Sequence, residues 1–334
     1  MTVRIGVNGF GRIGRSFYRA AAAAGADLEI VAVNDLGDVP TMAHLLAYDS
    51  ILGRLPVPVT AEPGAIRIGE ATLKVLSERD PAALPWGDLG VDVVIESTGV
   101  FTDAAKARAH LDAGAKKVVI AAPATGEDVT IVLGVNEDAY DPARHAIISN
   151  ASCTTNCLGV LAKVLHEAVG IDTGMMTTVH AYTQDQNLHD APHKDLRRAR
   201  AAALNVVPTS SGAAKAIGLV LPELKGRLDA FALRVPVPTG SITDLTVTTT
   251  RPTTVEEVKD AYAQAAAGAY KGLLSYVDAP IVSSDIVTDP ASCIFDAQLT
   301  RVLGGQVKVV GWYDNEWGFS NRLVDLARLI GESL

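Results

Sequence analysis

The sequence predicts an α/β protein with two domains, a Rossmann-type doubly wound parallel sheet and an α+β domain with a mostly antiparallel sheet. Three observations support this class. The first half alternates strands rich in valine and isoleucine with helices, a glycine-rich turn follows the first strand, and the second half has longer strands of alternating polarity. The 334 residues are enough for two hydrophobic cores.

Short apolar runs predict the buried strands of the first half, and apolar residues spaced three and four apart predict its helices. The stretch 51–77 is rich in proline and glycine and predicts a small antiparallel addition. The expected strands cover residues 3–7, 28–34, 91–96, 117–121 and 146–149, and the expected helices cover residues 12–24 and 104–113.

Past residue 150 the pattern changes to longer strands that suit an antiparallel sheet. Thr254 and Glu257 match the two ends of a capping box, so a helix is expected to begin there. Leu323, Leu326 and Ile330 share one stripe of a last helix. The expected strands cover residues 175–183, 231–237, 242–250 and 308–312, and the expected helices cover residues 158–169, 254–267 and 321–330.

The composition argues against several function classes. The net charge of −9 is unfavourable for a nucleic-acid partner, and no apolar run is long enough to span a bilayer. Three cysteines do not make a disulfide framework, and the first residues do not resemble a secretory signal. The expected location is therefore the cytoplasm.

Gly9, Gly11 and Gly14 form a G-x-G-x-x-G turn between the first strand and the first helix. In a βαβ unit such a turn lets a pyrophosphate approach the backbone at the helix N-terminus. Asp35 ends the next strand, where a carboxylate accepts hydrogen bonds from ribose hydroxyls and repels a 2′-phosphate. These residues predict a dinucleotide site that prefers NAD to NADP.

The run ASCTTNC at 151–157 precedes an amphipathic helix, with Ser152 as a candidate N-cap. Cys153 would then lie in the first helical turn, where the helix dipole makes a thiol easier to ionise and more nucleophilic. The alternative is a buried structural cysteine. His180 interrupts an apolar strand and could pair with Cys153 as a thiolate–imidazolium, then act as acid and base. The alternative for His180 is a core histidine bonded to the backbone.

Two further cysteines are interpreted as structural. Cys157 lies one helical turn beyond Cys153, and this spacing without a second pair of ligands does not suit zinc. Cys293 is isolated in the sequence. No metal site is expected.

Arginines give a separate signal for anions. Arg234 interrupts an apolar strand, where a charge is costly unless it faces a ligand or a partner. A basic cluster at 197–200 suits phosphate, although a solvated face or an internal ion pair would also explain it. The hydroxyl-rich run 209–212 precedes a helix and predicts a second anion site.

Together these motifs resemble the phosphorylating, NAD-dependent glyceraldehyde-3-phosphate dehydrogenases of the bacterial type, over essentially the whole chain. The matching runs are NGFGRIGR at 8–15, ND at 34–35, ESTG at 96–99, ASCTTNC at 151–157, HAYT at 180–183, HKDLRRARAA at 193–202, LRVPVP at 233–238 and WYDNEWG at 312–318.

The resemblance implies that glyceraldehyde 3-phosphate, NAD and inorganic phosphate give 1,3-bisphosphoglycerate. Cys153 would form a hemithioacetal and then a thioester, with His180 as base. The implied cofactor contacts are Gly9, Gly11, Arg12, Ile13, Asp35, Arg79 and Asn315. The implied contacts to the substrate phosphate are Thr183, Arg198 and Arg234, and those to inorganic phosphate are Ser152, Thr154, Ser211 and Gly212.

The resemblance also implies a homotetramer in which segment 181–207 packs beside a neighbouring subunit's cofactor. Because the last helix would return to the cofactor domain, residues 1–150 and 316–334 form the expected NAD-binding domain, and residues 151–315 the catalytic domain. Leu36 and Pro192 match positions that favour NAD, whereas Gly37 is less typical of NAD-dependent members. Other departures from the family pattern, none of which removes a catalytic group, are Ala121, Gly159, Val160, Ser211 and Phe319.

Two other functions stay open at this point. A related erythrose-4-phosphate dehydrogenase shares the cysteine run and uses water as the acyl acceptor. In an NAD-binding redox sensor, Cys153 would be oxidised instead of acting as a nucleophile. Such a sensor would not need Arg234.

Overall fold

The computed structural model describes residues 2–334, which form two compact units. The first contains residues 2–131, 138–151 and 320–334, and the second contains residues 132–137 and 152–319. Each unit has its own large sheet, and the predicted α/β class is confirmed. Within residues 2–334 no helix combines the length and apolarity needed to cross a membrane.

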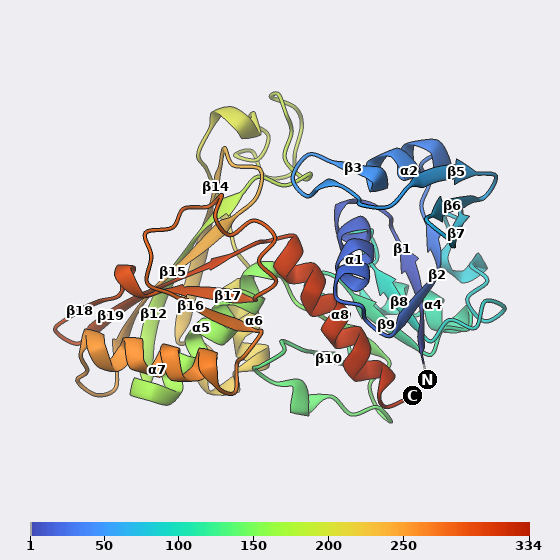
Figure 1. The fold of residues 1–334 in the computed structure, drawn as a ribbon. Helices are drawn as coiled ribbons and strands as arrows, with labels where there is room; N and C mark the ends of the chain where they lie inside the picture. Colours follow the sequence, from blue (N-terminus) through green and yellow to red (C-terminus); the bar gives the residue numbers. More distant parts are fainter. Residues whose placement is uncertain (1) are drawn as a thin grey trace. The chain divides into compact units, whose positions relative to one another are not determined.

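The first unit has a nine-stranded sheet in the order β10-β11-β9-β8-β1-β2-β7-β6-β5 (Figure 1). β1 (Val3–Asn8) lies inside it, in parallel with β2 (Leu28–Asn34) on one side and β8 (Val93–Glu96) on the other. The chain therefore adds strands outward from β1 in both directions, which makes the carboxyl ends of β1 and β8 a topological switch point, where open α/β sheets bind ligands.

The rest of this sheet continues the same pattern. The predicted antiparallel addition is confirmed, because β5 and β6 pair antiparallel with each other and β6 pairs antiparallel with β7. The remaining strands are β5 (Val59–Glu62), β6 (Ala65–Ile68), β7 (Ala71–Leu76), β9 (Lys117–Ile120), β10 (Val129–Thr130) and β11 (Ile147–Ser149), and β3 (Tyr48–Asp49) pairs separately with β4 (Gly53–Arg54).

The helices of this unit are α1 (Arg12–Ala23), α2 (Val39–Ala47), α3 (Ala104–Ala107), α4 (Ala109–Asp112) and most of α8 (Trp317–Gly331). The helix predicted over 104–113 is present, but it is divided at Arg108 into two short helices. Arg108 between them keeps helical angles, φ −55° and ψ −27°, but Leu111 N–H donates to the carbonyl of Arg108 only three residues back. At the other end, a Cβ on Gly331 would lie 2.1 Å from Val3, so α8 packs tightly against the start of β1.

The second unit has an eight-stranded sheet in the order β13-β14-β12-β15-β19-β17-β16, with β18 paired to β19. It is mostly antiparallel, as predicted, but β12 (Ile171–Ala181) runs parallel to β14 (Leu228–Val235), and β16 runs parallel to β17. Four strands of this sheet were not predicted from the sequence, and each of them has only three or four residues. The other strands are β13 (Val207–Ser210), β15 (Ser241–Thr249), β16 (Leu274–Val277), β17 (Cys293–Asp296), β18 (Arg301–Leu303) and β19 (Gln306–Tyr313).

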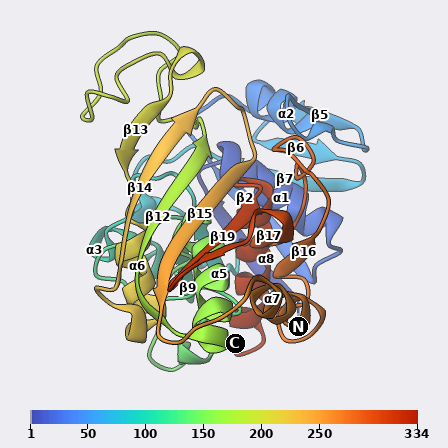
Figure 2. The same cartoon turned by 90° about the vertical axis from the view of Figure 1, so that its left-hand side faces the viewer.

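Three helices pack on one face of this second sheet (Figure 2). They are α5 (Cys153–Val169), α6 (Ala213–Val220) and α7 (Val255–Ala267). The expected cap of α7 is present, since Thr254 Oγ1 accepts from Glu257 N–H over 3.1 Å. The opposite face exposes large apolar side chains, with Met175 68% and Phe231 48% accessible.

Candidate active site

Cys153 is the first residue of α5 and is partly buried. Ser152 has extended backbone angles, and its Oγ accepts from Thr155 N–H over 3.0 Å, so it caps the helix as the sequence predicts. The preceding residue, Ala151, has φ 55°, a left-handed angle that costs a non-glycine residue about 1 kcal/mol. The backbone therefore turns sharply just before the thiol.

His180 lies near the end of β12 and is 4% exposed. Its Nδ1 is 2.7 Å from the carbonyl oxygen of Ala181, and because a carbonyl only accepts, Nδ1 carries the ring proton. The lone pair of Nε2 then faces Cys153 Sγ at 3.4 Å. The thiol can donate its proton to this nitrogen, which is the arrangement that a nucleophile and its base require.

The surroundings determine the charge of this pair. Burial raises the pKa of the Cys153 thiol, and the positive charge of Arg234 lowers it. Burial lowers the pKa of His180 to about 3, and the positive charge of Arg234 is the second-largest cause of this shift. Burial thus opposes the lowered thiol pKa expected from the helix terminus, and the imidazole is neutral at physiological pH. A neutral imidazole beside a protonated thiol can act as a general base.

Arg234 lies opposite His180 because β12 and β14 pair in that register. Its Nη1 donates to Thr183 Oγ1 over 2.7 Å and to the carbonyl of Ala181 over 3.3 Å. Its buried Nε has no hydrogen-bond partner within residues 2–334. Burial lowers the pKa of Arg234, and the nearby Asp185 carboxylate raises it. This guanidinium still has donor capacity for an anion.

A second arginine lies in the same unit and is held by carboxylates. Arg198 Nη1 donates to Asp185, and Arg198 Nε donates to Thr209 Oγ1 over 2.9 Å. Thr209 in turn donates to Asp195 over 2.7 Å, and Thr183 donates to Asp185. Arg198 therefore forms an internal ion pair, one of the alternatives that the sequence left open, and Asp185 links it to the Thr183 hydroxyl.

The remaining anion candidates lie at helix starts. Gly212 is the exposed N-cap residue of α6 and supplies no side-chain cap, while Ser211 Oγ accepts from Ala213 N–H over 3.3 Å. Thr154 follows Cys153 but is buried, and its hydroxyl is 2.8 Å from the Tyr313 hydroxyl.

Tyr313 is a residue that the sequence analysis missed. Its hydroxyl lies 2.8 Å from both Thr154 and Thr178, and its ring meets that of His180 edge to face at a centroid distance of 6.0 Å. Asn315, an expected cofactor contact, is buried and accepts from Ser241 Oγ over 3.1 Å. The WYDNEWG run contains both residues. The contacts of the Tyr313 hydroxyl, however, are to threonines of α5 and β12, which are far away in the sequence, so no local pattern predicts them.

Cys157 and Cys293 are both fully buried. A Cβ on Gly311 of β19 would lie 2.6 Å from Cys293 Sγ and 3.2 Å from Cys157 Sγ. Glycine at this position lets α5, β17 and β19 pack around the two thiols. In the part of the chain that the structure describes, no cluster of three or more His, Cys, Asp or Glu side chains could hold a metal ion.

In the first unit, two of the three glycines of the turn are packed closely against backbone atoms. A Cβ on Gly14 would lie 2.2 Å from the carbonyl oxygen of Gly9, and Gly9 itself has φ +92° with its Cβ position 2.7 Å from Thr98 N. These two glycines are needed for packing. A Cβ on Gly11, in contrast, would meet no atom within 4 Å. Gly11 therefore leaves open space at the N-terminus of α1, which an anionic ligand can approach.

Asp35 closes the other side of this turn. Its Oδ2 accepts from Phe10 N–H over 2.8 Å, and its Oδ1 accepts from Gly37 N–H over 2.9 Å. The expected contacts Arg12 and Ile13 open α1 and are partly exposed, and Arg79 is exposed. The open turn and the carboxylate at the end of β2 fit a dinucleotide with free ribose hydroxyls.

Comparison with known proteins agrees with this geometry. Residues 3–104 match the family described as glyceraldehyde 3-phosphate dehydrogenase, NAD binding domain, and residues 152–315 match its C-terminal domain. The chain is 84% identical, over the full length of both proteins, to glyceraldehyde-3-phosphate dehydrogenase 1 of Streptomyces avermitilis and to glyceraldehyde-3-phosphate dehydrogenase 2 of Streptomyces arenae. It is 68% identical to the glyceraldehyde-3-phosphate dehydrogenase of Mycolicibacterium smegmatis, again over the whole of both chains.

Proposed function

The chain belongs to the glyceraldehyde-3-phosphate dehydrogenase family, and we propose that it converts D-glyceraldehyde 3-phosphate, NAD and inorganic phosphate to 1,3-bisphosphoglycerate. The observation that carries this proposal is the contact of 3.4 Å between Cys153 Sγ and the unprotonated Nε2 of His180. It supplies a nucleophile with its base.

Acylation begins with the Cys153 thiol. As its proton moves to His180 Nε2, the sulfur attacks the aldehyde carbon, and the proton returns to the new oxygen to give a hemithioacetal. The backbone N–H of Cys153 lies in the first turn of α5, outside the helical hydrogen-bond ladder, and can donate to that oxygen while it is negative.

Oxidation leaves a thioester on Cys153. NAD, when bound, accepts the hydride from the hemithioacetal carbon. His180 Nε2 takes the hydroxyl proton of the hemithioacetal in the same step. An oxygen of inorganic phosphate then attacks the thioester carbon, and the Cys153 sulfur leaves as the acyl phosphate forms and takes the proton back from His180 Nε2.

The two phosphates need different donors. We assign the substrate phosphate to Arg234, Thr183 and Arg198, which the hydrogen bonds through Asp185 bring together. We assign inorganic phosphate to the start of α6 at Ser211 and Gly212, with Ser152 and Thr154. The Thr154 hydroxyl is hydrogen-bonded to the Tyr313 hydroxyl. Thr154 can therefore donate its proton to phosphate only when Tyr313 is the donor in that bond.

The cofactor is assigned to the first unit. Gly9, Gly11, Arg12 and Ile13 would hold the pyrophosphate at the start of α1, and Asp35 would accept from the adenosine ribose. Arg79 would contact the adenosine half, and Asn315 the nicotinamide half. Accordingly, we propose residues 1–150 and 316–334 as the NAD-binding domain and residues 151–315 as the catalytic domain.

Formation of NADH with and without phosphate tests the activity. We expect many turnovers with glyceraldehyde 3-phosphate, NAD and inorganic phosphate, and about one NADH per site without phosphate. Sustained turnover without phosphate would instead indicate water as the acyl acceptor, and no NADH at all would refute an aldehyde substrate. Replacing NAD by NADP should lower kcat/KM because Asp35 repels the 2′-phosphate.

We also propose that the protein is a cytoplasmic homotetramer. Exposed leucines in segment 181–207 support association, with Leu188 75%, Leu196 83% and Leu204 79% accessible. Met175 and Phe231 are exposed on the sheet face of the second unit. Light scattering after size-exclusion chromatography should give four times the mass of 34.9 kDa, and a monomeric mass would refute the proposal.

A further inference from the structure

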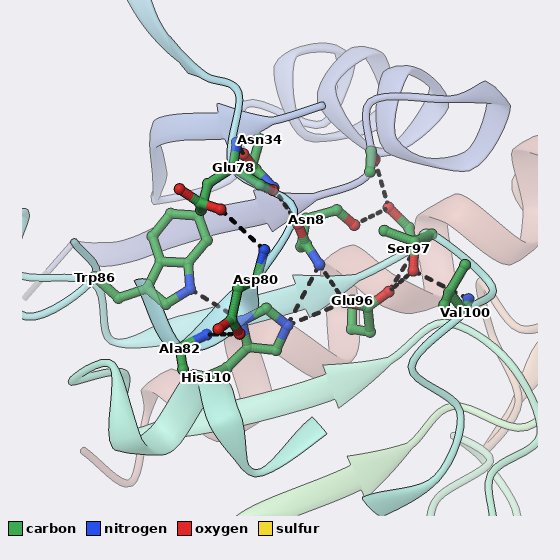
Figure 3. A network of polar contacts seen from close by, with 12 residues as sticks. Asn8, Asn34, Glu78, Asp80, Ala82, Trp86, Glu96, Ser97, Val100 and His110 are labelled. Carbon is green, nitrogen blue, oxygen red and sulfur yellow. Dashed lines mark hydrogen bonds and ion pairs between the residues drawn. The ribbon is translucent and has the colours of Figure 1, made fainter. Parts of the chain in front are cut away.

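A buried polar network lies at the carboxyl ends of the parallel strands in the first unit (Figure 3). The side chains of Glu96 and His110 are 1% and 0% exposed. Buried polar groups are costly unless donors and acceptors match, so the direction of each hydrogen bond is informative. The members are Asn8 of β1, Asn34 of β2, Glu96 of β8, His110 of α4, and Trp86.

Glu96 determines the direction of these bonds. The Trp86 indole N–H can only donate, so His110 Nδ1 accepts from it over 3.0 Å and His110 Nε2 carries the proton. Glu96 Oε2 accepts from this Nε2 over 3.0 Å and from Asn8 Nδ2 over 2.6 Å. Glu96 Oε1 accepts from Thr98 N–H over 2.8 Å and from the Thr98 hydroxyl. A carboxylate matches these four donors because it accepts at both oxygens and donates nothing.

The bond to Glu96 in turn fixes the orientation of two side-chain amides, those of Asn8 and Asn34. Since Asn8 donates to Glu96, its Oδ1 faces Asn34 and accepts from Asn34 Nδ2 over 2.7 Å. This leaves Asn34 Oδ1 to accept from Glu78 N–H over 2.8 Å, while Asn34 Nδ2 also donates to the Glu78 carbonyl over 2.8 Å. The Asn34 side chain therefore pairs with the backbone of Glu78 as a neighbouring strand would.

This pairing fixes the segment that follows β7. Asp35 N–H donates to the carbonyl of Leu76 over 3.1 Å, so the segment is held both at Leu76 and at Glu78. The next residue is the exposed Arg79. We propose that Glu96, through Asn8 and Asn34, is a positioning residue that holds Arg79 against the adenosine half of NAD. The inference rests on the NAD binding proposed above.

A purely structural role for the network makes a different prediction. If the network only stabilises the first unit, weakening it anywhere should lower stability and leave the dinucleotide affinity alone. If it positions Arg79, the end at Asn34 should affect affinity, while the end at Trp86 should affect stability only. Asn34→Ala and Trp86→Phe are therefore matched variants at opposite ends, and Phe keeps most of the buried ring.

The experiment measures the Kd of NAD and of ADP-ribose for the full-length protein, together with hydrogen exchange of the peptide that contains Glu78. For Asn34→Ala we expect a Kd about tenfold higher for both ligands, faster exchange at the Glu78 amide, and an unchanged kcat at saturating NAD. For Trp86→Phe we expect a lower melting temperature and a Kd within twofold of wild type.

A second variant covers the case in which Asn34→Ala does not fold. Glu96→Gln leaves Asn34 in place but offers an amide NH₂ to donors, so it should raise the same Kd values by disturbing the direction of the bonds. Unchanged Kd values in both folded variants, or an equal loss of affinity in Trp86→Phe, would overturn the positioning role. A wild-type protein that binds neither ligand would refute the proposed cofactor instead. Hydrogen exchange at the Glu78 amide would still test whether the network holds this segment.

Discussion

The nucleotide turn of the first unit and the Cys153 site of the second unit differ in what they are made of. Around the turn, backbone groups and glycines create the space, and Asp35 and Glu96 are held by hydrogen bonds from nearby donors. At the Cys153 site, side chains from α5, β12 and β14 meet, and burial displaces the pKa values of both Cys153 and His180. The first arrangement suits binding, and the second suits proton transfer.

The largest expected effect separates these two functions completely. Cys153→Ala removes the nucleophile and should lower kcat by a factor of about 10⁴ or more, while the Kd of NAD stays within about threefold. Steady-state NADH formation and NAD titration measure the two quantities. Cys157→Ala is the control, because it removes a buried thiol one turn along the same helix and should keep the activity. Residual activity above a few per cent in Cys153→Ala would exclude covalent catalysis by this residue.

The next effect is within the Cys153 site. Arg234→Leu should lower kcat/KM for glyceraldehyde 3-phosphate by about 100-fold, because a charged donor to the substrate phosphate is lost. The same change should raise the pKa of Cys153 and that of His180, since the charge of Arg234 lowers both. Alkylation of Cys153 by iodoacetamide should therefore slow at pH 7, and its rate should rise at a higher pH than in wild type.

A matched control is available in the same unit. Arg227 donates to the carbonyl of Ile171 over 3.1 Å and plays no part in the Cys153 site. Arg227→Leu should leave the pH dependence of alkylation unchanged. An identical profile for Arg234→Leu and wild type would show that Arg234 does not act on the thiol.

The third effect tests whether the turn binds through open space. Gly11→Ala should raise the Kd of NAD about tenfold with little change in melting temperature, because a Cβ there meets no protein atom within 4 Å. Gly14→Ala should instead lower the melting temperature strongly, since its Cβ would lie 2.2 Å from the Gly9 carbonyl. Calorimetry and NAD titration distinguish the two. A tight-binding Gly11→Ala variant would exclude close approach of a ligand at this glycine.

The two regions also differ in how far the sequence could predict them. Strand, glycine turn, helix and Asp35 are close together in the chain, so local pattern was enough to predict β1, α1 and β2. The contact between Arg234 and Thr183 depends on the register of β12 with β14, where His180 faces Arg234. That register is a long-range property, and the sequence gives no local sign of it.

Other misses have equally specific causes. Tyr313 acquires its role from Thr154 and Thr178, which lie on α5 and β12. The thiol pKa was expected to be low from the helix terminus, but burial acts in the opposite direction and cannot be read from the cap motif. The hydrogen bonds from Glu96 to Glu78 join residues from four parts of the chain, although Asn8, Asn34 and Glu96 each lie in a motif identified in the sequence.

The smallest expected effect concerns stability and follows from the charge state of His180. In the folded protein its pKa is about 3, against an ordinary value of 6.5, so below pH 6.5 the unfolded chain binds a proton that the folded protein does not. The stability contributed by neutral His180 is thus present above pH 6.5 and is lost as pH falls toward 3. Between pH 6.5 and pH 5.5 this group alone should lower the free energy of unfolding by about 1 kcal/mol. The difference in denaturant unfolding between wild type and His180→Asn over this range isolates it from the carboxylates. A constant difference would mean that folding does not shift the pKa of His180, and burial would then not be the reason that the imidazole is neutral.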